Sequence, residues 1–421
     1  MQLCIFEDQQ FSNFLPLVYF RPVYALRCGA TKLREKIEGF FPKASIVYHC
    51  RPLLTDFLRE VHPNKHVNEF SNEPTWFING RILADGNFRR LLKSAPGGDT
   101  VYGKEGNVIA AFVSDEFVRR EKEHIAGGVV SMDLFRGLSG EEVDATLLTY
   151  PWELVHRNGE EIRNDFLFFA QKMKGKRIPG KLSPGVSLLN RKEILIGNGT
   201  VVKPGVVLDA ETGPIIIGKN VTILSNAVIE GPVSIGDGSI IKAGCRIHGN
   251  SSIGEVCKVG GEVETSIVHS YSNKQHDGYL GHSYLGSWVN VGADTNNSDL
   301  KNNYSTVRVT VNGSSVDSGL QFVGLFMGDH SKTGINVMFD TGTVVGVSCN
   351  VYGAGLPPKY LPSFSWGNIA STFSAFRLEK SIETAQRVMA RRNVKWSPAY
   401  ERLFRDVFEQ TVSERARDRI F

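Results

Sequence analysis

The sequence lacks the features that mark secreted, membrane-bound and nucleic-acid-binding proteins. It has only six cysteines in 421 residues, scattered without a CxxC pair, which is typical of reduced thiols and speaks against a disulfide framework. The formal net charge is only +4, so charge gives no indication of nucleic-acid binding. No apolar run is long enough to cross a bilayer, and the first residues, MQLCIFEDQQFSNF, lack the basic and apolar regions of a signal peptide. We therefore expect a cytoplasmic protein that contacts neither membranes nor nucleic acid.

A six-residue period is the clearest pattern that the sequence does contain. Apolar residues recur at steps of six and are often followed by glycine. Neither an α-helix, with a period of about 3.6, nor a single strand, with a period of about 2, gives this spacing. It is typical of a parallel β-helix, in which three hexads form one triangular coil. The first run comprises Ile217, Ile223, Ile229, Ile235, Ile241, Ile247, Ile253 and Val259.

Beyond Val259 the predicted register slips by two residues. It resumes at Ile267, skips the polar Asn273 and continues through Tyr279, Leu285 and Val291. After a gap the period returns at Met327, Thr333, Phe339, Val345 and Val351. We expect the residues of this register to point into the β-helix.

The first 180 or so residues follow a different pattern. Short apolar segments such as MQLCIF and NVIAAFVS alternate with helical segments, which is typical of a Rossmann-like α/β domain with a mainly parallel sheet. A segment at roughly 172–185, rich in Lys, Pro and Gly, is the expected linker. At the other end, apolar residues at helical spacing predict a tail that packs on the β-helix or on a neighbouring subunit. We predict an α/β domain over 1–180, a β-helix over 186–360 and a helical extension over 361–421.

A polar insertion interrupts the hexads at 272–295, where the sequence reads SNKQHDGYLGHSYLGSWVNVGADT. A β-helix core has little room for such groups, so we expect them to point outward or to lie in a loop. EVE at 262–264 and KQHDGYLGHSYLGSWVNVGA at 274–293 resemble the acetyltransferase half of the bifunctional UDP-N-acetylglucosamine pyrophosphorylase/glucosamine-1-phosphate N-acetyltransferase (GlmU) family. The shared features are a histidine three residues before a tyrosine, then Leu-Gly and, after a spacer, V-N-V-G-A.

The resemblance implies a fold, an activity and an assembly. It implies a nucleotidyltransferase-like α/β domain, a left-handed β-helix, and a homotrimer that binds acyl-CoA between coils of adjacent subunits. It also implies acetyl transfer from acetyl-CoA to glucosamine 1-phosphate. In the N-terminal domain it implies uridylyl transfer from UTP with Mg²⁺.

Carried over to this sequence, the resemblance makes His276 the general base that deprotonates the sugar amine. Imidazole suits this role because its pKa lies near working pH. Lys274, Tyr279 and Asn290 would bind or orient the amino sugar. The backbone N–H of Ala293 would lie near the thioester of acetyl-CoA.

The sequence departs from the family pattern after position 295. Where the family continues with T-x-x-C-N-Y-D-G, this chain reads TNNSDLKNNYSTVRV. The expected replacements are Asn303 and Tyr304 for the sugar, and Lys301 and Arg308 for its phosphate, since cationic side chains match phosphate oxygens. The family's lysine just after V-E is also absent, so we expect the acceptor pocket to differ from that of the family.

The glycine-rich loop L-x-x-G-x-G-T-x-M, with which the family binds a nucleoside triphosphate, is absent as well. In its place residues 17–36 read LVYFRPVYALRCGATKLREK, a basic stretch that is either a phosphate site or a solvated helical face. In WFINGRIL, at 76–83, an asparagine stands where the family has an acidic Mg²⁺ ligand, so the sequence assigns no metal ligand. The candidate nucleotide contacts are Arg21, Arg27, Gly29 and Asn79.

Other interpretations of the sequence remain open. His269, His276 and His282 lie at steps of seven and six, so successive coils could bring them together as a zinc site like that of γ-class carbonic anhydrases. Alternatively, the N-terminal domain transfers a nucleotide to another sugar phosphate, or binds sugar nucleotides without turnover. The β-helix would then serve as an oligomerisation scaffold.

Overall fold

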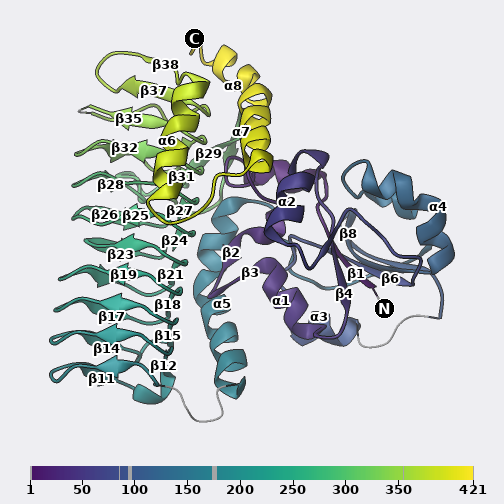
Figure 1. Ribbon diagram of the computed structural model, residues 1–421, viewed down its shortest axis with the longest axis horizontal. Coiled ribbons are helices and arrows are strands. Elements are labelled where there is room, and N and C mark those ends of the chain that lie inside the picture. Colours follow the sequence, from purple (N-terminus) through teal and green to yellow (C-terminus); the bar gives the residue numbers. More distant parts are fainter. Residues whose placement is uncertain (1, 85, 93–96, 173–177, 354, 421) are drawn as a thin grey trace.

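The computed structural model describes residues 2–84, 86–92, 97–172, 178–353 and 355–420. Figure 1 shows a tall stack of short strands beside an α/β domain, with the C-terminal helices lying against the upper part of the stack. The fold class predicted from the sequence is confirmed: the α/β domain comes first, the β-helix of hexapeptide repeats follows, and helices end the chain.

The N-terminal sheet is built around β1 (Gln2–Phe6), whose residues are all buried. β4 (Ser45–Tyr48) and β6 (Thr75–Asn79) flank β1 and run parallel to it, as expected for a sheet that is covered on both faces. The strand order is β5-β4-β1-β6-β8-β7-β9. The predicted parallel arrangement holds from β5 to β6, whereas β8 runs antiparallel to both its neighbours. The other strands are β5 (His66–Val67), β7 (Thr100–Lys104), β8 (Asn107–Val113) and β9 (Ser139–Glu142).

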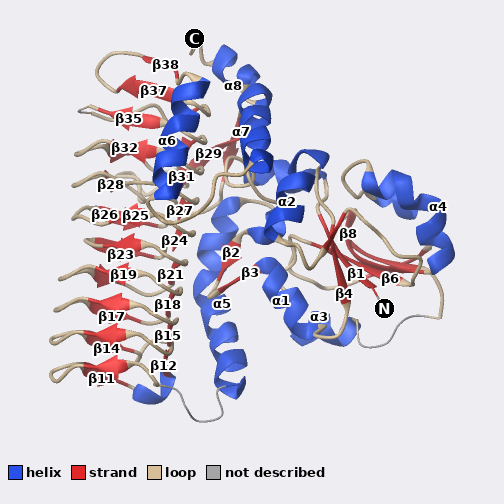
Figure 2. Ribbon diagram, in the orientation of Figure 1, coloured by secondary structure: helices blue, strands red, loops and turns tan. Residues whose placement is uncertain are grey.

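Helices cover this sheet and join it to the rest of the chain. In Figure 2 they surround the red strands of the domain. They are α1 (Leu33–Phe40), α2 (Thr55–Val61), α3 (Gly86–Leu91), α4 (Asp115–Ala126) and α5 (Pro151–Lys172). The last of them, α5, runs along the β-helix, where Ile162 and Phe166 pack against Leu195 and Ile216.

Each coil of the β-helix contributes to three parallel sheets, named faces 1, 2 and 3 in chain order, and the turns between them are corners 1–2, 2–3 and 3–1. Face 1 contains β10 (Lys181–Leu182), β13 (Val201–Val202), β16 (Thr222–Ile223), β19 (Ile240–Ile241), β22 (Lys258–Val259), β25 (Asn273–Lys274), β32 (Lys332–Thr333), β35 (Asn350–Tyr352), β37 (Ser365–Asn368) and the antiparallel β38 (Phe373–Ala375). Face 2 contains β11 (Ser187–Leu189), β14 (Val207–Asp209), β17 (Val228–Glu230), β20 (Arg246–Ile247), β23 (Glu262–Glu264), β26 (Tyr279–Gly281), β28 (Asn296–Asn297) and β33 (Met338–Phe339). Face 3 contains β12 (Ile194–Ile196), β15 (Ile215–Ile217), β18 (Val233–Ile235), β21 (Ser251–Ile253), β24 (Ile267–Val268), β27 (Tyr284–Leu285), β31 (Phe326–Met327), β34 (Val344–Val345) and β36 (Tyr360–Leu361).

The core of the β-helix confirms the first run of hexads, since every residue predicted from Ile217 to Val259 lies in it. The register predicted next, with Ile267, Asn273 and Tyr279 inward, is wrong. There the inward residues are Val268, Lys274 and Leu280. The reason is that the inward positions advance from Val259 to Val263 and then Val268, so two segments are shorter than a hexad. The predicted positions are inward again from Leu285 and Val291 onward.

Residues 298–325 leave the β-helix between β28 and β31, which explains the gap in the hexads. They include a hairpin of β29 (Arg308–Val311) and β30 (Ser314–Asp317). Its valines, Val309 and Val311, share an apolar cluster with Leu17 and Trp152 of the N-terminal domain. The insertion therefore helps to join the two parts of the chain.

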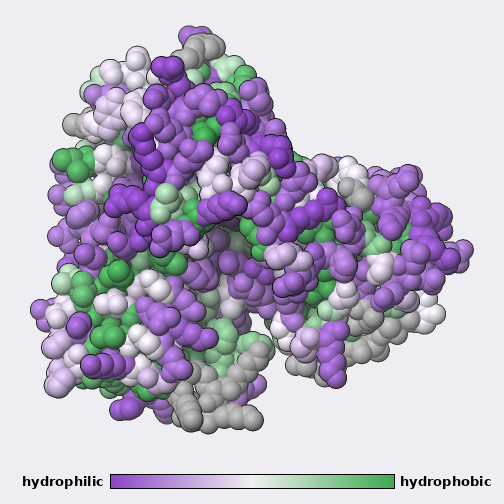
Figure 3. Space-filling view, viewed as in Figure 1, coloured by the Kyte–Doolittle hydropathy of each residue, from purple (hydrophilic) through white to green (hydrophobic). Residues whose placement is uncertain are grey.

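The C-terminal tail forms α6 (Leu378–Ala390), α7 (Pro398–Gln410) and α8 (Val412–Arg417). Ser397 caps α7, its hydroxyl accepting the N–H of Tyr400 (3.1 Å). Phe404 shares an apolar cluster with Phe364 of the β-helix and Phe20 of the N-terminal domain, so the tail packs on its own chain. The outer surface of the tail is mostly hydrophilic in Figure 3.

All six cysteines are free and buried, as expected for reduced thiols. Within the described ranges, no helix combines the length and the apolar character that a membrane span requires.

Candidate active site

His276 lies at corner 1–2, directly after β25, and its side chain is exposed. Ala293 takes the equivalent position in the next coil, where the N–H of Asp294 donates to the carbonyl of Asp277 (3.0 Å). The structure therefore brings the expected general base and the expected thioester contact to neighbouring coils of one corner.

Lys274 points into the β-helix, where it pairs with the core residue Val259. Its side chain is 1% exposed, and its Nζ donates to the carbonyl oxygens of Gly260 (3.0 Å) and His276 (2.7 Å). Burial lowers the pKa of this ammonium to about 8. The ammonium therefore holds the backbone turn that carries His276, and it does not reach the surface where a sugar would bind.

Tyr279 lies on face 2, and its hydroxyl donates to Glu264 (3.0 Å) and Asp299 (2.9 Å). A Cβ at Gly281 would clash with this hydroxyl, so the ring lies along the strand over that glycine. The phenol points toward corner 2–3, whereas His276 stands at corner 1–2. His276 lies just before β26 and Tyr279 begins it, but the Tyr279 hydroxyl points away from His276, toward the other end of the strand.

A histidine–aspartate pair that sequence reasoning missed stands at corner 2–3. The Nδ1 of His282 lies 2.8 Å from Asp299, and the imidazole stacks on Phe322 with ring centroids 5.1 Å apart. Burial opposes ionisation of Asp299, but hydrogen bonds from His282 and Tyr279 outweigh it and keep the pKa of Asp299 below its usual value. Once the repeat length is known, the 17-residue separation of His282 and Asp299, one coil, could have indicated this pair.

The four residues expected to complete the acceptor site lie on the insertion beyond corner 2–3. Lys301 donates to the carbonyl of Thr306, and Arg308 donates across the hairpin to Ser315. Asn303 is exposed, and Tyr304 is 66% exposed. The structure does not bring these side chains to His276 within one chain.

Asn290 lies on face 1, in a bridge between Asn273 and Lys332. It lines a cavity of about 310 Å³ together with Gln275, the residue before His276. Asn290 is therefore close to the corner that carries His276, although it faces a different side of the β-helix.

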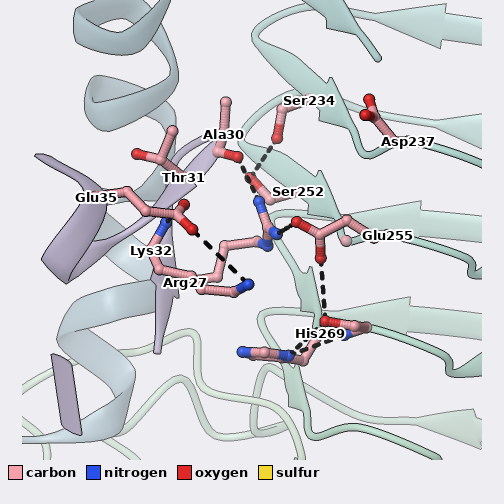
Figure 4. Close-up of polar contacts among 12 residues, drawn as sticks. Arg27, Ala30, Thr31, Lys32, Glu35, Ser234, Asp237, Ser252, Glu255 and His269 are labelled. Carbon is pink, nitrogen blue, oxygen red and sulfur yellow. Dashed lines mark hydrogen bonds and ion pairs between the residues drawn. The ribbon is translucent and has the colours of Figure 1, made fainter. Parts of the chain in front are cut away.

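The basic stretch of the N-terminal domain forms a seam with the β-helix. Arg21 pairs with Asp329 and donates to Ser287 (3.0 Å), and Arg27 pairs with Glu255 (2.5 Å). The side chains of Arg21 and Arg27 are 11% and 2% exposed, so neither lies on a solvated helical face. Figure 4 shows Arg27 reaching from the N-terminal domain to Glu255 on the β-helix.

His269 continues this seam on the β-helix side. Its Nε2 lies 3.1 Å from the carbonyl of Ala25, and its Nδ1 accepts the N–H of Ser270 (2.9 Å). The hydroxyl of Ser270 in turn donates to Glu255 (3.0 Å). Arg27, one of the expected contacts to nucleotide phosphates, therefore binds a carboxylate of the same chain, as Figure 4 shows.

Gly29 lies in a turn whose backbone N–H groups already bind side chains of α5. The N–H of Gly29 donates to Asn158 (2.7 Å), and those of Ala30 and Thr31 donate to Asp165 (2.8 and 3.2 Å). Gly29 has a φ of +84°, and a Cβ there would clash with Asp165. The turn is an anion-binding turn of the kind expected, but its anion is a carboxylate of the same chain.

The crevice at the carboxyl end of β1 is where open α/β sheets bind ligands, because the strand order reverses there. Arg51 pairs with Glu7 (3.1 Å) and Arg81 with Asp8 (2.6 Å), and the amide of Asn79 donates to Asp8 (2.8 Å). Both carboxylates are therefore engaged by guanidinium groups. These side chains do not fit the expected Mg²⁺ site, since a hard cation needs free carboxylate oxygens.

The proposed zinc ligands are not brought together. His269 lies at corner 3–1, His276 at corner 1–2 and His282 at corner 2–3, because a step of about six residues moves along the coil by one face. Across the residues that the structure describes, no group of three or more His, Cys, Asp or Glu side chains is arranged to hold a metal ion. The zinc interpretation of these histidines is therefore wrong.

Two parts of the chain match known families. Residues 3–174 match the family described as sugar nucleotidyl transferase, and residues 214–249 match the bacterial transferase hexapeptide family (six repeats). The bifunctional protein GlmU of Rippkaea orientalis is 31% identical over 157 residues, which cover 35% of this chain and 28% of that protein. A bifunctional sugar-1-phosphate nucleotidylyltransferase/acetyltransferase of Sulfurisphaera tokodaii is 35% identical over 97 residues, which cover 23% of this chain and 24% of that protein.

Two further matches are a longer sequence alignment and a distant solved structure. The bifunctional protein GlmU of Thermotoga petrophila is 24% identical over 235 residues, 50% of this chain and 49% of that protein. The chain thus spans between about a quarter and a half of the length of these curated relatives. A crystal structure of UDP-N-acetylglucosamine acyltransferase covers 52% of this chain and 76% of its own, with 14% identity and a TM-score of 0.24, too low to support any statement about activity.

The matches and the fold define a class of protein in which a sugar nucleotidyl transferase domain precedes a hexapeptide β-helix. Within this class, the relatives at about 30% identity and the residues around His276 mark a narrower group. The relatives named here are bifunctional GlmU proteins, to which this chain is similar over part of its length.

Proposed function

We propose that the β-helix transfers an acetyl group from acetyl-CoA to the amine of glucosamine 1-phosphate, with His276 as general base. The observation that carries this proposal is the exposed His276 at corner 1–2, one coil away from Ala293 and on a turn fixed by Lys274. The names of the relatives, which combine nucleotidylyltransferase and acetyltransferase activities, support the same reaction class.

The chemistry needs a base because a protonated amine cannot attack a thioester. In the proposed reaction His276 takes a proton from the amine, the nitrogen bonds to the acetyl carbon, and the carbon–sulfur bond breaks. The proton then passes to the departing sulfur, so that free coenzyme A and the N-acetyl sugar leave. An N–H group at Ala293 would stabilise the negative charge that develops on the thioester oxygen.

A homotrimer is part of the proposal. The residues expected to bind the sugar are divided between corner 1–2, which carries His276, and corner 2–3, toward which the Tyr279 hydroxyl points and where the insertion begins. One chain cannot join two of its own corners into one site, whereas neighbouring copies of a β-helix can bring different corners face to face. A cytoplasmic location is proposed with it, in keeping with the free cysteines.

The N-terminal domain has two candidate functions. Its match to sugar nucleotidyl transferases supports Mg²⁺-dependent uridylyl transfer from UTP to the sugar 1-phosphate. The carboxylates Glu7 and Asp8, both paired with arginine, favour a second candidate, a domain that binds a sugar nucleotide without turnover. Release of pyrophosphate from UTP and N-acetylglucosamine 1-phosphate would decide for the first candidate, and its absence for the second.

The test of acetyl transfer is acetyl-CoA consumption in the presence of glucosamine 1-phosphate. His276→Gln should slow it about 100-fold or more, because general bases commonly contribute at least that much. His248→Gln is the matched control, since His248 lies in the same β-helix but contacts Glu230 and has no proposed role in acetyl transfer. A natural chain that consumes no acetyl-CoA, or a His276→Gln variant that keeps the natural rate, would show the proposal to be wrong.

A further inference from the structure

A cavity of about 310 Å³ lies between face 1 of the β-helix and the end of α6. Its floor is a ladder of outward side chains on successive strands, Lys258, Asn273, Asn290 and Lys332. Figure 1 shows the lower end of α6 next to these strands. Arg391 and Arg392, which follow α6, complete the lining, and Arg392 donates to Asn273 (2.7 Å).

The cavity gathers four cations without a counter-charge. No aspartate or glutamate is among the described residues that line it. Elsewhere in the chain, buried guanidinium groups such as Arg27, Arg51 and Arg81 each face a carboxylate. Gathering like charges without an anion costs free energy, and no carboxylate among the described lining residues offsets this cost. The arrangement therefore favours an anionic ligand.

Lys258 and Lys332 are the two lining cations that the β-helix itself contributes. Lys332 is recessed, and its Nζ donates to the carbonyl of His330 (2.6 Å). Burial lowers the pKa of Lys332 to about 8, and the pKa of Lys258 is lowered by burial and then by the charges of Arg392 and other cations. Arg391 and Arg392 could be explained as cations that complement the C-terminal end of the α6 dipole. That explanation does not cover Lys258 and Lys332, which belong to the β-helix.

The shape and the other lining groups suit a small organic phosphate. Trp288 provides an apolar wall, with its ring stacked on Tyr271 at a centroid distance of 4.3 Å. Asn273 and Asn290 offer amides that can bind hydroxyl groups. A volume of this size matches the lower end of the range for small-molecule sites. Guanidinium and ammonium groups together recognise phosphate by charge and by paired hydrogen bonds.

We propose that this cavity binds the phosphate group of a small phosphorylated molecule, held by Lys258 and Lys332 from face 1 and by Arg391 and Arg392 from the tail. The site is separate from the seam and from the crevice at β1 but shares Asn290 with the candidate active site, so its choice of ligand rests on the proposed function. Binding is measured without acetyl-CoA, so a failure of binding and a failure of acetyl transfer are distinguishable.

The experiment is titration calorimetry on the full chain with glucosamine 1-phosphate, inorganic phosphate and glucosamine as probes. We expect saturable binding of glucosamine 1-phosphate that weakens with salt, and none of glucosamine. Equal binding of inorganic phosphate would identify free phosphate as the ligand of the same site. The proposal would be overturned if neither glucosamine 1-phosphate nor inorganic phosphate showed saturable binding, or if glucosamine bound as tightly as glucosamine 1-phosphate.

The Lys258→Gln/Arg391→Gln double variant tests the location of the site. Each lost charged hydrogen bond should weaken binding about tenfold, so the dissociation constant should rise about 100-fold. Arg387→Gln is the matched control, because Arg387 lies one turn earlier on α6 and pairs with Glu383. Unchanged binding in the double variant, or an equal loss in the control, would overturn the assignment.

The melting temperature without ligand separates a binding site from a structural contact. Removing two of four mutually repelling charges should leave the melting temperature unchanged or raise it. If the double variant melts clearly lower than the natural chain and loses binding, the cations hold α6 on face 1 and the proposal fails. Lys332→Met, which keeps a long apolar stem on the same strand, gives an independent second variant for the same comparison.

Discussion

The ammonium of Lys274 lies inside the β-helix and donates a hydrogen bond of 2.7 Å to the carbonyl oxygen of His276. A lysine therefore occupies a core position that neighbouring coils fill with Val259 and Val291. Burying an ammonium among apolar side chains costs free energy, and its hydrogen bonds to the carbonyl oxygens of Gly260 and His276 offset part of this cost. The contact ties the backbone of the exposed histidine to the interior of the protein.

The first prediction concerns acetyl transfer in Lys274→Met. The variant keeps an inward side chain of similar length but loses both hydrogen bonds to the turn. We expect kcat to fall about tenfold, the size of one lost charged hydrogen bond, with little change in the KM for acetyl-CoA. Leu280→Met, at the adjacent inward position, is the control and should keep the natural kcat. A natural kcat in Lys274→Met would show that the turn does not need this lysine.

The second prediction concerns pH. Burial lowers the pKa of Lys274 from 10.5 to about 8, so between these values the unfolded chain holds a proton that the folded chain has released. More protons on the unfolded state mean that the contribution of Lys274 to the free energy of unfolding rises with pH over this range. Lys274→Met lacks this contribution. The natural chain should therefore gain stability relative to the variant between about pH 8 and 10.5.

Urea unfolding of both chains at about pH 7.5, 9 and 10 checks this expectation. Buried cysteines and tyrosines also titrate in this range, so only the difference between the two chains is informative. Lys380→Met, on the exposed face of α6, is the control for replacing a lysine by methionine. A constant difference for Lys274→Met would mean that its ammonium stays protonated in the fold.

The third prediction is that Gly281→Ala destabilises the chain. An added Cβ would clash with the hydroxyl of Tyr279 and the carboxylate of Asp299, and relieving the clash would break their hydrogen bond. We expect the free energy of unfolding to fall by about 1–3 kcal/mol, as for other overpacked sites. Gly128→Ala, where a Cβ meets open space, should have little effect. An unaffected Gly281→Ala variant would contradict the position of the Tyr279 ring over this glycine.

The fourth prediction concerns the seam. Arg21→Met leaves Asp329, whose side chain is only 3% exposed, without its partner. Removing one member of a buried pair should cost about 3–5 kcal/mol, measured by denaturant unfolding. The double variant Arg21→Met/Asp329→Asn should recover part of this loss. Arg59→Gln, in the exposed pair with Glu69, should cost no more than about 1 kcal/mol.

The sequence predicted the repeats well because their signal is local. An inward apolar residue returns after six positions, and the run from Ile217 to Val259 needs no tertiary information. The register then failed because two short segments and the polar Lys274 hid the inward position. A period can be read only while the residues that carry it stay apolar.

The candidate site was harder to predict because its geometry depends on which corner each residue occupies. His276 and Tyr279 are three residues apart, yet the Tyr279 side chain lies along β26 and points its hydroxyl toward the opposite corner. The expected partners of the basic stretch are nucleotide phosphates, but Arg21 and Arg27 pair with Asp329 and Glu255, far away in sequence. No spacing within the stretch reveals partners at that distance.

The stacking of Phe20 on Phe404, with ring centroids 5.4 Å apart, bears on how the chain is made. The N-terminal domain is synthesised before α7, so the face of Phe20 that packs on Phe404 stays uncovered until α7 has formed. The β-helix covers another part of the same ring earlier, through the edge-on contact of Phe20 with His330. A nascent chain stalled before α7 should therefore bind chaperones at the remaining apolar patch, and this binding should stop once α7 has docked.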